Sequence, residues 1–257
     1  MITLKNEDIK RVYDLIEMCP DMFKHVPLKF YKDSDGNSFA SVETVNINCD
    51  IIFSGVTVVN ELILEPGTGT VVKLPLNKTV LNSFFKQTDS VINLSKQHIE
   101  LKDKKKHLKI SLFRINEEDI LEFPYTGKEI FDIIRKDNNQ ENSNFVEVEL
   151  DKNDISDFLC CVDVLSEVNI FTVSVKNESI DIESSDSFGN SFKYVFDVST
   201  GQEFKVKFDS SLVKLFSKVS KYYADYSVKI LISELMIAFT LEREGSTVVL
   251  ALTAQKE

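Results

Sequence analysis

A strand that runs into a polar residue and then into an amphipathic helix occurs four times along this chain. The strands are expected at residues 2–4, 72–76, 146–150 and 204–208, and the polar residues that follow them are Asn6, Asn77, Asp151 and Asp209. Apolar and polar residues alternate in each strand, which is typical of a half-buried strand. Asn and Asp side chains can accept hydrogen bonds from the first free N–H groups of a helix. Four occurrences of one junction indicate an internal repeat.

Each predicted helix carries an apolar stripe on one face, with the spacing i, i+3, i+4, i+7 in three helices and with Thr88 at the last place in the second. The stripes are Ile9, Val12, Tyr13 and Ile16; Leu81, Phe84 and Phe85; Ile155, Phe158, Leu159 and Val162; and Leu212, Leu215, Phe216 and Val219. Three further strands are expected after each helix, at residues 26–31, 38–45 and 49–53; 91–94, 98–101 and 108–113; 170–175, 179–183 and 192–198; and 228–232, 236–241 and 248–253. The pattern therefore predicts four β-α-β-β-β units of about 50–70 residues each.

The four units group into two domains. The first and third units align without a gap around Leu4 and Leu150, and the second and fourth correspond with a shift of one residue. We expect an N-terminal domain over residues 1–115 and a C-terminal domain over residues 145–257, of class α+β with antiparallel sheets. Residues 116–144 contain a polar, Asn-rich run and are expected to form a connector with one short helical turn.

The composition is that of an ordinary globular chain. Of its 257 residues 43% are hydrophobic and 28% are charged, and the formal net charge is −11. The chain has no run of about 18 apolar residues, so we expect no membrane contact. Its charged N-terminus lacks the apolar segment of a signal peptide, which favours an intracellular location. The acidic balance argues against non-specific wrapping by nucleic acid, although a local basic face would overturn that argument.

The sequence offers little that resembles a catalytic or metal centre. His25, His98 and His107 match no metal-ligand pattern, and no C-x-x-C pair indicates a zinc site. The only Gly-rich spot, at residues 67–69, lacks the further residues of a phosphate-binding loop. Residues 33–37 resemble the start of a calcium loop without its closing acidic residue, so a turn between two strands is expected there. We therefore expect no enzymatic activity, no cofactor and no metal.

Two tandem domains of paired β-α-β-β-β units with a mid-chain connector resemble the DNA sliding clamps, in particular the bacteriophage T4-type clamp and proliferating cell nuclear antigen. Residues 204–253 carry most of the resemblance, through their strand, lysine-bearing helix, hairpin and final apolar strand. The resemblance implies a DNA-clamp fold, with antiparallel sheets outside and helices lining a ring that is usually a homotrimer. It also implies that a clamp loader places the ring around double-stranded DNA and that the ring tethers a DNA polymerase.

The predicted fourth helix has a row of lysines on the face opposite its apolar stripe. Lys214, Lys218 and Lys221 stand at i, i+4 and i+7, and about 100° per residue places them away from the core. A DNA-facing inner helix requires such a face, and a solvated charged face is the alternative. The other residues expected to face DNA are Lys10, Arg11, Lys78 and Lys86. The third helix departs from this pattern because Asp157 points outward, and a second basic cluster at residues 102–107 is expected to be a solvated turn.

Partner docking and ring closure give further expectations. Clamp clients insert a short apolar peptide into a groove between the connector and the final strand. The matching positions here are Phe123, Pro124, Tyr125, Leu250, Ala251, Leu252 and Val42, with ordinary core or loop packing as the alternative.

Open sheet edges favour head-to-tail association, and we expect a strand near residues 108–113 to meet one near residues 170–175 of the next subunit.

Two other functions stay open at this point. The first is a clamp-like processivity factor or adapter that keeps the fold but works as a monomer or dimer. The second is a β-rich ligand-binding protein without a role on DNA, for which the sequence offers no convergent polar pocket. As a clamp, the protein would work in the cytoplasm of a prokaryotic host, such as that of a phage, or in a eukaryotic nucleus.

Overall fold

The structure is a computed structural model of two compact units, and each unit is described by itself. It describes residues 2–20, 25–45, 51–60, 62–65, 67–75, 78–85, 91–95, 98–102, 105–111, 145–165 and 167–255. Unit 1 comprises Met1–Ile47, Phe53–Gly127 and Glu244–Val248, and unit 2 comprises Asn48–Ile52, Lys128–Arg243 and Val249–Glu257. The predicted connector and the predicted domain limits fall on or beside residues outside the described ranges, so they stay predictions.

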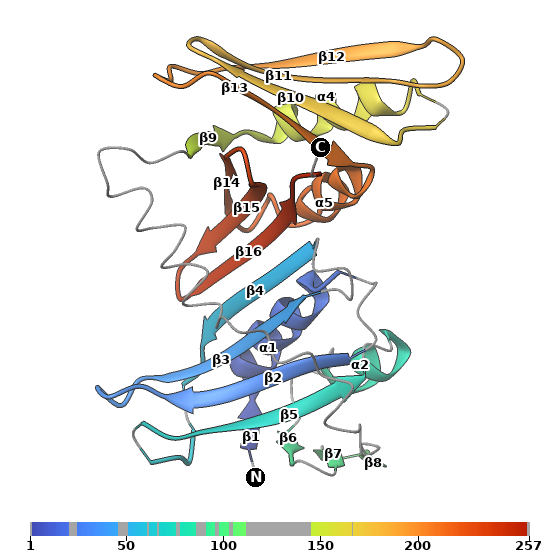
Figure 1. Cartoon of the computed structure of the whole chain (residues 1–257). Coiled ribbons are helices and arrows are strands. Elements are labelled where there is room, and N and C mark those ends of the chain that lie inside the picture. The colour runs from blue at the N-terminus through green and yellow to red at the C-terminus, as the bar shows by residue number, and fades with distance from the viewer. Residues whose placement is uncertain are drawn as a thin grey trace. The chain divides into compact units, whose positions relative to one another are not determined.

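Unit 1 contains two antiparallel sheets and two described helices (Figure 1). Its elements are β1 (Ile2–Lys5), α1 (Asn6–Met18), β2 (His25–Lys32), β3 (Ser38–Val45), β4 (Ile51–Val58), β5 (Gly69–Pro75), α2 (Lys78–Phe85), β6 (Val91–Leu94), β7 (His98–Lys102) and β8 (His107–Ser111). Within unit 1 the neighbouring strands follow the orders β1-β6-β7-β8 and β5-β2-β3-β4, and the first two residues of β4 are assigned to unit 2. Strand β8 is therefore an edge strand of unit 1.

Unit 2 repeats this element order. Its elements are β9 (Val146–Leu150), α4 (Lys152–Val162), β10 (Ile170–Lys176), β11 (Ser179–Ser185), β12 (Ser191–Asp197), β13 (Phe204–Asp209), α5 (Ser211–Val219), β14 (Ser227–Ile232), β15 (Met236–Arg243) and β16 (Ser246–Thr253). The strands are ordered β12-β11-β10-β13 and β16-β15-β14-β9. The described chain thus runs four times through one strand, one helix and three strands, in mostly antiparallel sheets of an α+β fold.

The polar residues at the four junctions behave differently from one another. Asp151 caps α4 as predicted, because its side chain accepts from the backbone N–H groups of Asn153 and Asp154. Asp209 Oδ1 accepts from the Ser211 N–H at 2.7 Å, although Ser210 is the N-cap residue of α5. The prediction for Asn6 is wrong, since α1 already begins there and the strand runs directly into the helix. Asn77 lies outside the described residues.

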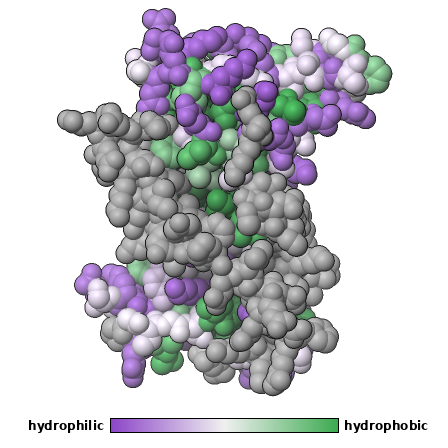
Figure 2. All heavy atoms as spheres, viewed as in Figure 1, coloured by the Kyte–Doolittle hydropathy of each residue, from purple (hydrophilic) through white to green (hydrophobic). Residues whose placement is uncertain are grey.

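The apolar helix stripes are buried against the sheets. In unit 2 the Phe158 ring of α4 lies 4.0 Å from the Phe216 ring of α5, measured between centroids, and both residues are fully buried. In unit 1 the Tyr13 hydroxyl of α1 donates to Asn82 Oδ1 of α2 at 2.6 Å. On the face drawn in Figure 2, the described surface is mostly hydrophilic, and apolar residues show in smaller areas. The amphipathic helices therefore place their polar faces away from the core.

The turn resembling a calcium loop uses its carboxylate internally. Asp33 Oδ1 accepts from the Asn37 N–H at 2.8 Å, and the hydrogen bond from the Asn37 side chain is the main reason that the pKa of Asp33 is lowered. Asp186 makes the same contacts with Asn190 in the β11–β12 turn. The sequences of the two turns are DSDGN and DSFGN, and each has its glycine at φ 86°. The prediction of a turn is confirmed.

Candidate functional site

The lysine row on α5 is the strongest local concentration of positive charge that helix spacing predicted. Leu212, Leu215, Phe216 and Val219 are at most 1% exposed, so the opposite face of α5 points away from the core. Lys214 and Lys221 are exposed and Lys218 is half-buried. Lys221 lies in the turn after the helix and not on it, because α5 ends at Val219. The row is nevertheless kept together, since the Lys221 N–H donates to the Lys218 carbonyl at 3.3 Å.

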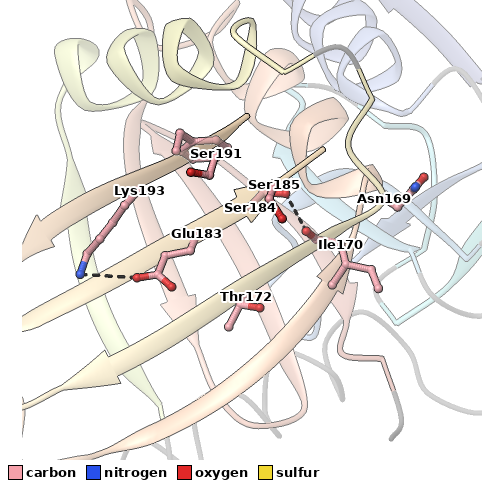
Figure 3. Close-up of a pocket in the computed structure, with 9 residues that line it drawn as sticks. Asn169, Ile170, Thr172, Glu183, Ser184, Ser185, Ser191 and Lys193 are labelled. Atoms are coloured by element: carbon pink, nitrogen blue, oxygen red, sulfur yellow. Dashed lines mark hydrogen bonds and ion pairs between the residues drawn. The ribbon is translucent and has the colours of Figure 1, made fainter. Parts of the chain in front are cut away.

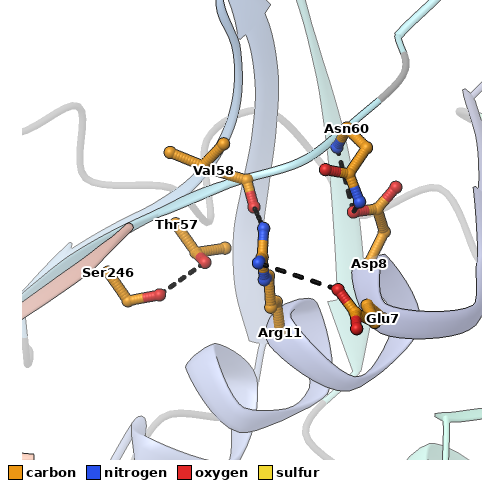
Figure 4. Close-up of polar contacts among 7 residues, drawn as sticks. All are labelled: Glu7, Asp8, Arg11, Thr57, Val58, Asn60 and Ser246. Atoms are coloured by element: carbon orange, nitrogen blue, oxygen red, sulfur yellow. Dashed lines mark hydrogen bonds and ion pairs between the residues drawn. The ribbon is translucent and has the colours of Figure 1, made fainter. Parts of the chain in front are cut away.

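Arg11, the second predicted DNA contact on α1, is held by its own unit (Figure 4). Its Nη1 donates to the Val58 carbonyl at 3.3 Å, and its Nη2 lies 3.8 Å from the Glu7 carboxylate. One turn earlier, the buried Asp8 carboxylate accepts from the Asn60 N–H at 2.9 Å. These contacts attach the first turns of α1 to the end of β4. Arg11 therefore has a structural role that helix spacing alone did not reveal.

The remaining predicted DNA contacts give less information. Lys10 is exposed on α1. Lys78 is the first residue of α2, but its side chain is not described, and Lys86 lies outside the described residues.

Helix α4 presents negative charge where α5 presents lysines. Asp157 and Cys160 are exposed on it, and the Tyr194 hydroxyl of β12 lies 3.5 Å from Asp154 Oδ1. Burial raises the pKa of Tyr194 to about 12, and the charges of Asp154 and Asp157 act in the same direction. The negative charge on this side of α4 comes from the carboxylates of Asp154 and Asp157 themselves, since burial is the largest cause of the raised pKa.

The predicted peptide groove falls on core residues wherever it can be seen. Val42 of β3 and Leu250, Ala251 and Leu252 of β16 are at most 1% exposed. Phe123, Pro124 and Tyr125 lie outside the described residues. These four strand residues are therefore core residues, and their side chains form no open surface.

Sequence reasoning missed an exposed leucine in the β14–β15 turn. Leu235 is 76% exposed, and its carbonyl accepts from the Ala254 N–H at 2.8 Å. The next residue, Gln255, donates its N–H to the Lys207 carbonyl at 2.8 Å. The end of the described chain therefore lies beside this apolar side chain, within unit 2. The sequence did contain a sign of this exposed side chain, because Leu235 stands among the polar turn residues of a predicted hairpin.

The two strands that were expected to meet between subunits take different places in their own sheets. Strand β8 is an edge strand, but β10 lies between β11 and β13, so the prediction that residues 170–175 form an edge is wrong. The period-two pattern identified the strand without giving its place in the sheet. The described end strands of this sheet are β13, which pairs with β10, and β12, whose Phe192 and Tyr194 are only half-buried.

A surface hollow of about 660 Å³ in unit 2 offers no catalytic arrangement (Figure 3). The Ser184 hydroxyl donates to the Ile170 carbonyl at 2.7 Å, and Lys193 Nζ lies 3.5 Å from Glu183 Oε1. Lys193 also pairs with the neighbouring Asp181 carboxylate at 2.7 Å. Among the residues that the structure describes, no group of three or more His, Cys, Asp and Glu side chains could hold a metal ion.

Comparison with known proteins places the fold. No family model matches the sequence, and no curated protein matches it. Solved structures place the chain in the class of clamp-like folds. It is similar to the crystal structure of proliferating cell nuclear antigen from Entamoeba histolytica, with a TM-score of 0.68 over 99% of both chains. The two sequences are 10% identical, so this likeness establishes the fold alone. Within the described part of the chain, no helix is long and apolar enough to cross a membrane.

Proposed function

We propose that this protein is a sliding clamp that encircles duplex DNA and tethers a DNA polymerase to its template. The observation that carries the proposal is the lysine row of α5, which lies on the solvent side of a helix in a chain with the fold of proliferating cell nuclear antigen. Lysines neutralise backbone phosphates without reading sequence, as a ring that slides requires. The action is topological, so the clamp catalyses no reaction.

Ring closure would use one sheet edge from each unit, β8 of unit 1 and β12 of unit 2. Leu108 and Ile110 of β8 share the core face of their sheet with Leu101 and Ile99, their partners on β7, yet Leu108 remains 38% exposed. Phe192 and Tyr194 of β12 are half-buried on the core face of the other unit. A β8 edge that pairs with the β12 edge of a second copy would continue both sheets and cover these side chains. Because one edge belongs to each unit, the contact is head-to-tail and can close a ring, which we propose is a trimer.

The ring proposal is tested by replacing Leu108 with Asp. A charge at the centre of the contact should shift the solution mass, measured by light scattering, from three chain masses toward one. Leu235→Asp places the same charge on an exposed leucine outside the contact and should leave the mass unchanged. A wild-type protein that stays monomeric at about 100 μM, far above the micromolar affinity range, would instead favour the clamp-like monomeric factor.

Polymerase tethering is proposed for the surface around Leu235. Its exposed side chain and the neighbouring end of the described chain offer an apolar anchor point beside the buried Leu252 strand. The predicted connector residues Phe123, Pro124 and Tyr125 would complete the groove. A short apolar peptide that buries two or three anchors there is expected to bind with micromolar affinity. Clamp loading by a separate loader belongs to the same proposal.

DNA binding is tested with two matched double variants. Lys214→Ala with Lys221→Ala removes two exposed lysines from the row, and Lys205→Ala with Lys207→Ala removes two exposed lysines from β13. Both variants change the net charge equally. Anisotropy of a fluorescent duplex across a salt series should show weaker binding for the α5 variant only. The slope of log K against log salt should become shallower by about 0.9 for each phosphate that the variant no longer neutralises.

The salt series also has a clear negative outcome. Equal effects of the two double variants would mean that only net charge matters, and no effect of either would remove the DNA role. A β-rich ligand-binding protein is the remaining alternative, but in the described hollow the Ser184 hydroxyl bonds the Ile170 carbonyl and Lys193 pairs with Glu183 and with the neighbouring Asp181.

A further inference from the structure

Helices α4 and α5 of unit 2 occupy equivalent places in the repeat, which allows their solvent faces to be compared position by position. The stripe Ile155, Phe158, Leu159 and Val162 has the same spacing as Leu212, Leu215, Phe216 and Val219. Both stripes turn toward the same core, where the rings of Phe158 and Phe216 meet. Superimposing the stripes by sequence therefore also superimposes the opposite faces.

At the positions of the three α5 lysines, α4 and the residues after it have one acidic residue and two neutral residues. Asp157 takes the position of Lys214, and Cys161 takes that of Lys218. Val164, which is 65% exposed just after α4, takes the position of Lys221. Helix α5 and the turn after it thus carry three lysines at positions where α4 and the residues after it carry one carboxylate and no lysine.

We propose that unit 2 contacts duplex DNA from one side only: α5 holds the phosphate backbone, and α4 keeps it away through Asp157, the residue that stands where α5 has Lys214. This inference rests on the proposed clamp function and identifies the residue that limits the strength of the DNA contact. An exposed carboxylate repels a phosphate at short range. It also cannot neutralise the phosphate charge, as a lysine at the same position would. A ring held from one side binds weakly, and a weakly held ring slides.

Helix α1 of unit 1 also lacks a lysine row at the equivalent positions. On α1 the position of Lys214 is taken by Arg11, whose guanidinium is turned to the Val58 carbonyl and to Glu7. Lysines on the solvent face of a described helix therefore form a row only on α5.

The experiment introduces the missing charge at Asp157. Asp157→Lys should tighten binding of a labelled duplex and steepen the salt slope by about 0.9 for each additional phosphate that is neutralised. Asp157→Asn removes the repulsion without adding a positive charge, so it should tighten binding with little change in slope. Glu178→Lys is the matched control, because Glu178 is exposed in the β10–β11 turn of the same unit and undergoes the same change of charge. Circular dichroism verifies that each variant is folded.

The outcomes separate this inference from the proposal beneath it. If Asp157→Lys leaves binding unchanged while the Lys214 and Lys221 double variant weakens it, the repelling role of α4 is refuted and the clamp function stands. Equal tightening by Asp157→Lys and Glu178→Lys would also overturn the inference, since net charge would then explain both. If the double variant has no effect, the DNA role itself fails.

Discussion

Replacing Phe158 with Ala should remove a large part of the stability of unit 2. The Phe158 side chain is fully buried, and its ring centroid lies 4.0 Å from that of Phe216 and 6.2 Å from that of Phe171. Two further rings, those of Phe192 and Tyr194, lie 6.0 Å away. Truncation of a buried Phe costs about 3–5 kcal/mol, and aromatic neighbours favour the upper end of that range. Against a typical total of about 5–15 kcal/mol, this is a severe loss.

The loss is measurable by urea or thermal unfolding of the full chain, followed by circular dichroism. For a unit of this size, about 4 kcal/mol corresponds to a fall of roughly 10–20 °C in Tm. Phe188→Ala is the control, because Phe188 is 77% exposed at the tip of the β11–β12 turn and should cost less than about 0.5 kcal/mol. A loss below about 1 kcal/mol for Phe158→Ala would refute the reasoning, since α4 would then not be packed through this ring.

Three further predictions concern single positions. Gly55→Ala should cost about 1–3 kcal/mol in urea unfolding, because the new Cβ would lie 2.4 Å from Leu15 Cδ1 and the leucine would have to move. Asp151→Ala removes the capping box of α4 and should cost about 0.5–2 kcal/mol, whereas Asp151→Asn should retain most of the stability. The hydrogen bond from His107 lowers the pKa of Glu100 from 4.5 to about 2, so its stabilising contribution is present above pH 4.5 and is lost as the pH falls toward about 2. Carboxyl NMR should show this pKa moving upward in His107→Ala; an unchanged value would exclude the contact.

The alternation of apolar and polar residues predicted strand limits well where no contact from another element changes them. The limits expected for residues 38–45 and 91–94 agree with β3 and β6 to the residue. Strand β4 was expected to end at Phe53 but continues to Val58 through Gly55. A glycine normally weakens a strand, but here the Leu15 side chain of α1 fills the place that a Cβ would need. That reason is tertiary, and no local pattern contains it.

For the candidate site, too, helix spacing predicted some features, and others depend on tertiary contacts that the sequence pattern does not contain. Helix spacing placed Lys214 on the solvent face of α5, because the buried stripe determines where the opposite face points. Spacing could not show that Arg11 bonds the Val58 carbonyl, 47 residues away. It also could not show that β10 is an inner strand and that β12 and β13 are the end strands of its sheet, because alternation identifies a strand without its neighbours.

A repeat of this kind separates the positions that specify the fold from those available for function. The stripe positions must stay apolar in every unit, because a buried polar replacement there costs several kcal/mol. The opposite face tolerates exchange within about 0.5 kcal/mol, so Lys214 and Asp157 can occupy equivalent places without disturbing the shared core. The twin turns behave alike, since the same Asp–Asn hydrogen bonds support Asp35 in one and the exposed Phe188 in the other. Function in this chain should therefore be sought where the repeats differ, as the solvent faces of α4 and α5 do in their charge.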